Sequence, residues 1–322
     1  MRRRVIQIAN STQLVSLPIS WARSLNIKKG DELEVVPEGN KLTISAEHQP
    51  EFKAISLDVT GVDRTSLLYL IRGLYRRGYD QIDLSFRDPL TIHFRTEKKE
   101  KVAAIIYTEV SRLSGMEIVR QTDSSCSVKC ISEATPREFE SIMRRIFLLL
   151  SDLNTEFVKA ASKSDITSLE NVEQKHHTIS KFISYCIRLL NKHGHPEHGK
   201  ITFLHHILAT LDRITDFLKY GARDLLVYKK PLKPETIQVL NRGINAVNMY
   251  HKFFFEFNFD LLSKLNENRD TCKREIEKLS GKIPYPEFHV LHKMEQTLDL
   301  FLDLCESRIS IAEFPQNTAS KN

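Results

Sequence analysis

The chain has 322 residues and a formal net charge of +6. This length predicts two or three domains, and so small a positive charge does not by itself indicate a nucleic-acid partner. No apolar run is long enough to span a membrane and no cleavable signal opens the chain, so we expect a cytoplasmic protein without a membrane span. The five cysteines are odd in number and scattered, which indicates a reducing compartment; they are Cys126, Cys130, Cys186, Cys272 and Cys305.

The first domain, residues 1–48, is predicted to hold four short strands and one short helix, with turns at 10–12 and 38–40. The segment has few large apolar side chains, so it cannot bury enough surface to fold alone. Exchange of hairpins with a second copy would complete its core, which predicts a homodimer. Pro18 suits the first turn of the helix and Gly30 suits its C-terminal cap. The alternating positions expected in the core are Val5, Gln7, Leu33, Val35, Leu42 and Ile44.

Two motifs flank the short helix expected at 19–27. Leu17-Pro18 precedes it, and Ile27-Lys28-Lys29-Gly30-Asp31 follows it. With the neighbouring strands, this order resembles the AbrB/MazE/SpoVT swapped-hairpin family over residues 5 to about 45. The resemblance implies an intertwined dimeric β-barrel that binds DNA. The side chains expected to contact DNA phosphates are Arg2, Arg3, Arg4, Arg23, Lys28 and Lys29. The alternative is a solvated face, because acidic residues offset much of this charge: Asp31, Glu32, Glu34 and Glu38.

The second domain, residues 51–133, has the predicted order β-α-β-β-α-β-β. Strands are expected at 52–59, 81–86, 90–94, 117–121 and 127–131, and helices at 63–78 and 96–115. Asp63 can cap the first helix, whose apolar residues recur with a helical period. The order is close to a ferredoxin-like sandwich. Because it contains no phosphate-binding glycine loop and no catalytic group, we expect a spacer or dimerisation domain, with a small-ligand sensor as the alternative.

The third domain, residues 136–314, is predicted to be helical throughout. Its helices are expected at about 136–162, 167–193, 197–224, 233–263, 267–280 and 285–312. Long helices joined by short loops indicate an antiparallel bundle. The division of the six helices into two groups of three suggests an internal repeat, with halves at about 136–224 and 233–312. The aromatic run 251–257 is too apolar for a solvated helix, so we expect it to pack in the core or between subunits. Residues 315–322 are predicted to be a disordered tail.

The third helix of each predicted repeat carries acidic residues four apart, which places them on one helical face. The first reads Asp212-Arg213-Ile214-Thr215-Asp216, and the second carries Glu295, Asp299, Asp303 and Glu306. These motifs resemble the PhoU family, a two-repeat helical bundle with E/D-x-x-x-D motifs. The resemblance implies bound iron or zinc clusters and regulation of phosphate uptake. Tyr220 and Arg223 depart from the family's extended motif, which usually has Asn and Glu at these positions.

The metal ligands that this resemblance implies are Asp212, Asp216, Glu295, Asp299, Asp303 and Glu306. Such hard oxygen donors suit magnesium, manganese or iron, and zinc is tolerated. The competing interpretation is that these acids point to water, because acidic pairs with this spacing also arise by chance. The histidines at 193–198 and at 176–177 would suit a transition metal, but an exposed polar loop is the favoured interpretation.

The sequence as a whole predicts an α+β multidomain protein: a swapped-hairpin β-barrel, a ferredoxin-like α/β domain and an all-α PhoU-like bundle. It contains no nucleophile elbow, P-loop or H-E-x-x-H motif, so we expect a non-enzyme. The domain order resembles phosphate uptake regulators typical of archaea. This implies a homodimeric, DNA-binding transcriptional regulator that senses phosphate status, with phosphate transporter subunits or a phosphate-sensing kinase as further partners. The alternatives are a cytoplasmic adaptor that docks on such a transporter or kinase, and a metal-storage bundle.

Overall fold

The computed structural model describes residues 2–8, 12–38, 41–46, 52–132 and 135–313. The chain divides into two compact units, Met1–Phe52 and Lys53–Asn322, and each is described by itself. Most of the predicted turns at 10–12 and 38–40, and the predicted tail at 315–322, lie outside the described residues.

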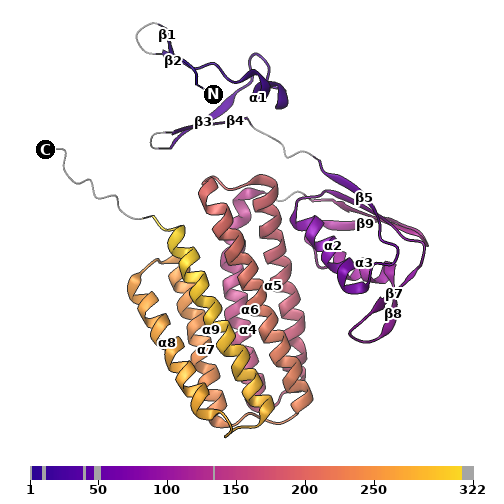
Figure 1. Ribbon diagram of the computed structural model, residues 1–322, viewed down its shortest axis with the longest axis vertical. Helices are drawn as coiled ribbons and strands as arrows, with labels where there is room; N and C mark the ends of the chain where they lie inside the picture. The colour runs from indigo at the N-terminus through magenta and orange to yellow at the C-terminus, as the bar shows by residue number, and fades with distance from the viewer. Residues whose placement is uncertain (1, 9–11, 39–40, 47–51, 133–134, 314–322) are drawn as a thin grey trace, which may run out of the picture. The chain divides into compact units, whose positions relative to one another are not determined.

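The first unit consists of short antiparallel hairpins with a short helix between them (Figure 1). β1 (Ile6–Ile8) pairs with β2 (Thr12–Leu14), and β3 (Leu33–Glu38) pairs with β4 (Lys41–Ala46). The helix α1 spans Ile19–Ser24. The predicted succession of strand, helix and hairpin is therefore present, whereas the closed dimeric barrel stays a prediction.

The end of α1 differs from the prediction. Asn26, not Gly30, takes the left-handed conformation after the helix, at φ 53°, and the amide of Ile27 donates to the carbonyl of Ala22 at 2.9 Å. Asparagine is one of the few non-glycine residues that tolerate this conformation at a helix end. Gly30, at φ 98°, lies in the next turn, where the Asp31 carboxylate accepts from the Lys28 amide at 2.7 Å.

The apolar side chains of the first unit are exposed in the single copy. Val5, Val35 and Leu42 are 59%, 52% and 60% exposed, and none of the described side chains of this unit is buried. Of the predicted core positions, Gln7 is exposed as well, while Leu33 and Ile44 are half-buried. The described side chains of a single copy therefore form no core of their own, and the exposed apolar residues are free to pack against another protein surface.

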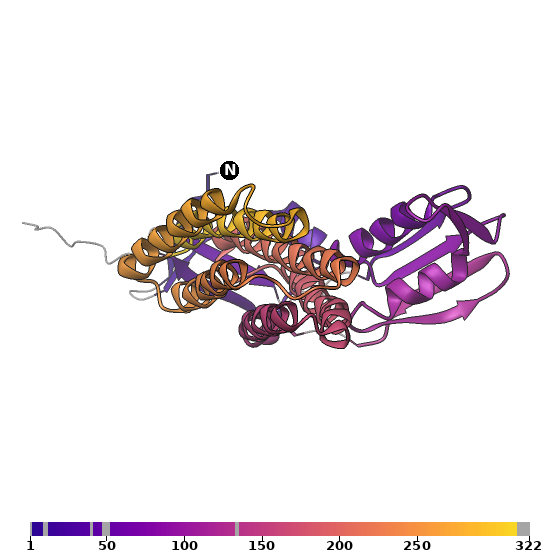
Figure 2. The ribbon, with the colours of Figure 1, turned by 90° about the horizontal axis from the view of Figure 1, so that it is seen from below.

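The second unit begins with a four-stranded sheet that carries two helices on one face (Figure 2). β5 (Ala54–Asp58) lies parallel to β6 (Gln81–Ser85), and β10 (Ser125–Cys130) lies antiparallel between β6 and β9 (Met116–Gln121). The helices are α2 (Arg64–Arg76) and α3 (Val102–Val110). Apolar residues of both helices and of one sheet face, among them Ile82, Leu84 and Val128, form a continuous core.

This topology differs from the predicted ferredoxin-like sandwich. In that fold another strand separates the two parallel strands joined by the first helix, whereas β5 and β6 are direct neighbours. The helix expected at 96–115 also begins later, because β8 (Lys98–Lys101) pairs with β7 (Leu90–His93) as a separate hairpin. Cross-strand pairing thus overrides the helical preference of a lysine-rich segment.

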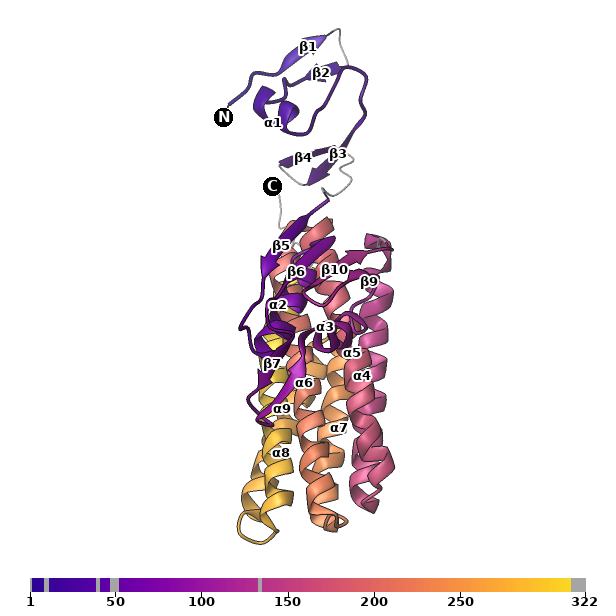
Figure 3. The same ribbon diagram turned by 90° about the vertical axis from the view of Figure 1, so that its right-hand side faces the viewer.

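The rest of the second unit is a bundle of long helices that run alongside one another (Figure 3). They are α4 (Phe139–Lys163), α5 (Ile166–His193), α6 (Ile201–Tyr228), α7 (Pro234–Phe255), α8 (Phe259–Leu279) and α9 (Tyr285–Ser310). α4–α6 and α7–α9 form the two predicted groups of three, which meet where α6 packs on α9 and α4 packs on α7. In the described ranges, no helix combines the length and apolar character needed to cross a membrane.

The fourth and fifth bundle helices were predicted at 233–263 and 267–280, and the position of the break between them was wrong. α7 ends at Phe255 and α8 begins at Phe259, because the Asn258 side chain accepts from the Asp260 amide at 2.7 Å and caps α8. The aromatic run at 251–257 contributes to the bundle core, as one of its two predicted placements requires: Phe253 is fully buried.

A buried ion-pair network joins the sheet-and-helix layer to the bundle. Asp80, just before β6, is 4% exposed, and its Oδ1 accepts from Arg188 at 2.7 Å and from Lys192 at 2.5 Å, both on α5. Arg188 also donates to the carbonyls of Tyr75 and Tyr79, at 3.0 and 2.7 Å. Burial raises the pKa of Asp80, but the hydrogen bond and charge of Lys192 lower it overall. The carboxylate is therefore the shared acceptor of this junction.

Replacement of Asp80 by Asn would leave the guanidinium of Arg188 buried without the carboxylate that balances its charge. We expect the free energy of unfolding to fall by about 3–5 kcal/mol, as for other broken buried ion pairs. Urea denaturation followed by circular dichroism measures the loss. The matched control is Asp83→Asn, because Asp83 is half-buried on β6 and accepts a hydrogen bond from Gln81; we expect a loss below about 1 kcal/mol there. Equal losses would contradict the role given to Asp80.

Candidate functional site

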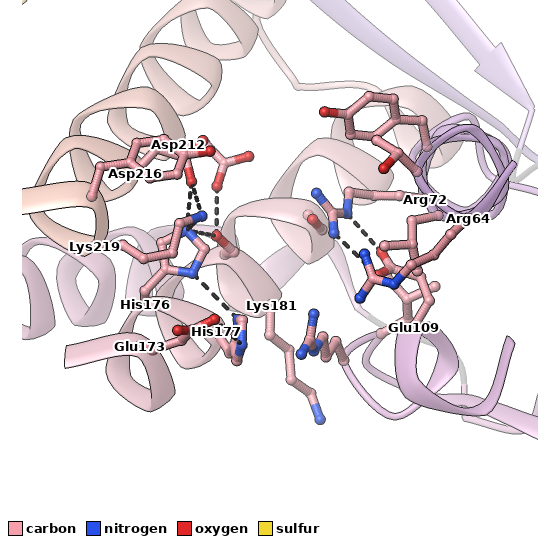
Figure 4. A pocket seen from close by; sticks show the side chains of 18 of the residues that line it. Arg64, Arg72, Glu109, Glu173, His176, His177, Lys181, Asp212, Asp216 and Lys219 are labelled. Atoms are coloured by element: carbon pink, nitrogen blue, oxygen red, sulfur yellow. Dashed lines mark hydrogen bonds and ion pairs between the residues drawn. The ribbon is translucent and has the colours of Figure 1, made fainter. Parts of the chain in front are cut away.

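A polar cavity of about 210 Å³ lies between α2 and α3 on one side and α5 and α6 on the other (Figure 4). Among the described residues, seven cationic and four acidic side chains line it, which leaves a net charge of +3. The cations are Arg64, Arg72, Arg95, Arg112, Lys181, Lys219 and Arg223, and the acids are Glu109, Glu173, Asp212 and Asp216. The cavity is smaller than the roughly 300–1,000 Å³ typical of sites for drug-sized ligands.

Asp212, on α6, connects the bundle to α2. One of its carboxylate oxygens accepts from Arg76 at 2.7 Å and the other accepts from the Ser180 hydroxyl at 2.6 Å. The Arg76 guanidinium also donates to the Ser184 hydroxyl, at 3.0 and 3.2 Å. The first of the predicted metal ligands is therefore already engaged by a cation from the other side of the cavity.

Asp216, one helical turn further along α6, is held in the same way by residues of the bundle. Its Oδ1 accepts from His176 Nε2 at 2.8 Å and from Lys219 Nζ at 2.5 Å. Burial raises the pKa of Asp216, but the hydrogen bonds from His176 and Lys219 lower it well below the ordinary value. Asp216 is therefore ionised at neutral pH.

Ser180, His176 and Asp216 do not form a nucleophilic triad, although the three residue types meet here. In such a triad the histidine uses one ring nitrogen for the serine and the other for the carboxylate. Here the same nitrogen, Nε2 of His176, lies 2.8 Å from Asp216 and 3.5 Å from the Ser180 hydroxyl. Ser180 donates to Asp212 instead, so the arrangement suits charge pairing rather than nucleophilic attack.

The other two carboxylates of the cavity are also paired with arginines. Arg72 makes a bidentate pair with the fully buried Glu109, at 2.7 and 3.1 Å, and Arg223 pairs with Glu173 at 2.6 Å. Burial raises the pKa of Glu173, but the hydrogen bond and charge of Arg223 lower it overall. Each of the four acids that line the cavity thus has a cationic partner.

Four of the seven cations of the cavity are not partners of these acids. One of them, Arg64, pairs with Glu100 at 3.1 Å. Within the described residues, the side chains of Arg95, Arg112 and Lys181 make no hydrogen bond and no ion pair. Figure 4 shows Lys181 between the ion pairs of α5 and α6 and those of α2 and α3. Burial lowers the pKa of Arg112, although the nearby Glu109 carboxylate acts against this. The cavity therefore carries positive charge that no described acid compensates.

The predicted metal ligands do not come together as one site. Asp212 and Asp216 line the cavity, whereas on α9 Glu295 contacts His292 at 3.3 Å and Asp299 pairs with Lys273 at 2.8 Å. The remaining two, Asp303 and Glu306, are exposed. In the part of the chain that the structure describes, no group of three His, Cys, Asp or Glu side chains is placed to hold a metal ion. The paired carboxylates fit ion pairing with arginine and lysine better than a metal.

The residues predicted to contact DNA are exposed on the first unit. Arg23 lies in the last turn of α1, and Lys28 and Lys29 lie in the turn that follows it. Arg2, Arg3 and Arg4 precede β1 and are exposed as well. Exposed cations near one short helix suit phosphate contacts, which stay a prediction.

Sequence reasoning missed the cationic side of the cavity. Arg72 and Arg76 lie four residues apart on α2, a spacing that places both on one face and was visible in the sequence. His176 and Lys219 were not recognised as partners of Asp216, because 40 residues separate His176 from it along the chain. The pair His176-His177 was noted only as a possible metal site.

Comparisons with known proteins agree with the resemblance of the first unit. The family model described as "Antidote-toxin recognition MazE, bacterial antitoxin" matches residues 6–52. The resemblance found for residues 5 to about 45 is thereby confirmed. No curated protein sequence matches the chain.

The solved structures similar to this chain include PhoU proteins. PhoU from Pseudomonas aeruginosa is 17% identical with a TM-score of 0.42, over 54% of this chain and 94% of that one. The phosphate transport system regulatory protein PhoU from Streptococcus pneumoniae is 13% identical with a TM-score of 0.40, over 54% and 93%. A PhoU-like protein from Shewanella oneidensis MR-1 is 13% identical with a TM-score of 0.43, over 53% and 96%.

The environment of His177 predicts a pH dependence of stability. Burial and the charge of Arg112 lower the pKa of His177 to about 4. Because an unfolded histidine titrates near pH 6.5, the unfolded chain binds a proton between about pH 6.5 and 4 that the folded chain does not. The contribution of neutral His177 to the free energy of unfolding is therefore fully present above about pH 6.5. It falls as the pH drops, by about 1–2 kcal/mol at pH 5.

Urea denaturation at pH 7 and pH 5 tests this. We expect His177→Gln to lose less stability between the two pH values than the unchanged protein, because glutamine does not titrate. The control is His198→Gln, which changes an exposed histidine. If His177→Gln and the unchanged protein lost the same amount, His177 would not be the group responsible.

Proposed function

We propose that this chain is a DNA-binding transcription regulator of phosphate uptake. The first units of a homodimer bind DNA, and the second unit senses phosphate status. The observation that carries the DNA part is the match of residues 6–52 to the MazE family, on a segment whose cationic residues are exposed. The proposed link to phosphate is supported by the PhoU-like motifs that begin at Asp212 and Glu295.

Exposed apolar side chains support the dimer. Residues at the predicted core positions, such as Val35 and Leu42, remain more than half exposed in one copy. A unit of this size in which none of the described side chains is buried needs further apolar contacts to be stable. A second copy with the same hairpins supplies matching surfaces, since symmetric association pairs the same patch on both subunits.

The exposed cations of the first unit are suited to neutralise DNA phosphates. Each phosphate contact by lysine or arginine releases a counterion, so affinity falls steeply with salt. Arg23, Lys28 and Lys29 lie close together in sequence around the end of α1, and the dimer doubles the set. Their positions near the helix end suit contacts to the backbone of the duplex, which fix register without reading sequence.

The double substitution Lys28→Gln, Lys29→Gln tests the DNA part. Fluorescence anisotropy compares DNA from upstream of phosphate-transport genes with a scrambled duplex, at 50 and 200 mM salt. We expect weaker binding by the variant and a salt slope reduced by about one for each lysine removed, since each contact releases about one counterion.

The control for this experiment is Lys159→Gln, Lys252→Gln, which removes two exposed lysines of the bundle. It should bind DNA as the unchanged protein does. Weak, salt-insensitive binding of the unchanged protein to every duplex would refute the DNA role. Pull-down with transporter subunits would then test the adaptor alternative.

The substitution Leu42→Lys tests the dimer. The side chain of Leu42 is 60% exposed in one copy, so a lysine there costs the monomer little, but it would place two charges in the shared core of a dimer. We expect sedimentation velocity to show a shift from dimer to monomer at micromolar concentration. Ser20→Lys, at an exposed position of α1, should remain dimeric. An unchanged sedimentation coefficient for Leu42→Lys would place the dimer contact elsewhere.

A further inference from the structure

The cavity between α2, α3, α5 and α6 has an unusual charge balance. Its four carboxylates are each paired with a cation, as described above, and Arg95, Arg112 and Lys181 have no such partner within the described residues. Like charges that face one small space repel each other, and the cost rises as water is excluded. An anion in the cavity would remove this cost.

Arg112 is the most informative of the three cations. It lies just after α3, is half-buried, and has the charge of Arg72 nearby. A guanidinium out of bulk water needs an acceptor for its fixed donors, because unpaired buried donors are costly. The acid whose charge acts most strongly on Arg112 is Glu109, and it already accepts both bonds of a bidentate pair from Arg72. The acceptor for Arg112 must therefore come from elsewhere.

We infer that the cavity binds a small anion that carries a phosphate group, held by Arg112 and Lys181 with Arg95 at the edge. This inference rests on the proposed function for its biological meaning, since the ligand would be the signal sensed by the second unit. The site itself is defined by the side chains and does not depend on DNA binding.

The chemistry of the cavity favours a phosphate group over a single carboxylate. A phosphate monoester carries about −1.5 to −2 charge at neutral pH, which comes close to the excess of the cavity. Arginine binds phosphate oxygens through two parallel hydrogen bonds, and lysine adds a point charge. Neutral His177, whose pKa is lowered to about 4, adds a donor without adding charge. A volume of about 210 Å³ admits inorganic phosphate and small phosphorylated molecules but not a nucleic-acid duplex.

A ligand in the cavity would contact both the layer of α2 and α3 and the helical bundle. Arg112 belongs to the layer of α2 and α3, and Lys181 belongs to α5 of the bundle. The buried contact of Asp80 with Arg188 already fixes the layer to α5. A bound anion would add a second bridge between the same two parts and so stabilise their packing, by an amount set by ligand concentration relative to Kd.

Isothermal calorimetry on the full-length protein tests the inference, with inorganic phosphate, sulfate, pyrophosphate and ATP as probes and chloride held constant. We expect at least one phosphate compound to bind, and Arg112→Gln and Lys181→Gln each to weaken it about ten- to a hundredfold, the loss expected for a charge-assisted hydrogen bond. Arg112→Lys keeps the charge, so its affinity for the anion should lie between that of the unchanged protein and that of Arg112→Gln. Thermal unfolding of each variant without ligand shows that it is folded.

The matched controls are Arg120→Gln, on the exposed part of β9, and Lys252→Gln, on the bundle surface. Both should bind the probes as the unchanged protein does. Binding of phosphate itself identifies the free ion as the ligand source, and binding of ATP alone identifies a phosphorylated metabolite. Absence of binding for all probes, or equal losses in Arg112→Gln and Arg120→Gln, would overturn the inference.

The calorimetry uses no DNA, so the two proposals can fail separately. A protein that binds DNA but none of the anions keeps the regulator role and loses the anion site. A protein that binds an anion through Arg112 but no DNA keeps the site and loses the role proposed for the first unit.

Discussion

The contact of Asp80 with Arg188 and Lys192 is the interaction on which the architecture of the second unit depends. It fixes the chain after α2 onto α5 inside a buried, charged junction. Because this end of α2 is held, the face that carries Arg72 and Arg76 is directed to α5 and α6 rather than to solvent. The polar cavity is therefore a result of how the layer is fixed to the bundle.

Charge matching explains the chemistry of that cavity. Carboxylates on α6 that would suit a metal in isolation are here the acceptors of Arg76, Lys219 and His176. Side chains of the protein thus supply the positive charge that a cluster of acids alone would need from metal ions. Once every acid has a partner, the remaining arginine and lysine side chains determine which ligands are attracted, and these are anions.

Local signals were readable from the sequence. The cap of α2 at Asp63 was predicted and is confirmed, since its side chain accepts from the amides of Thr65 and Ser66. The cap at Asn258 has the same physical basis but was overlooked beside a long apolar run. Strand β8 was not predictable, because its lysines favour a helix until β7 offers a pairing partner.

Long-range signals were not readable. The spacing of Asp212 and Asp216 places both on one face of α6, and both line the cavity. Their partners decide what the site does, and Arg76 lies 136 residues away from Asp212 along the chain. No periodicity or spacing rule connects such residues. The same holds for Asp80 and Arg188, separated by 108 residues, so a single sequence shows the acids and leaves the cations unassigned.

Because these partners are far apart in the sequence, they are synthesised at different times. The layer with α2 and α3 leaves the ribosome before α5 and α6, and domains generally fold as they emerge. Until α5 follows, Asp80 has neither Arg188 nor Lys192, and Arg76 has no Asp212. In the nascent chain, the charged side chains of this layer are therefore exposed to solvent without their partners. They become interior only when the later helices arrive.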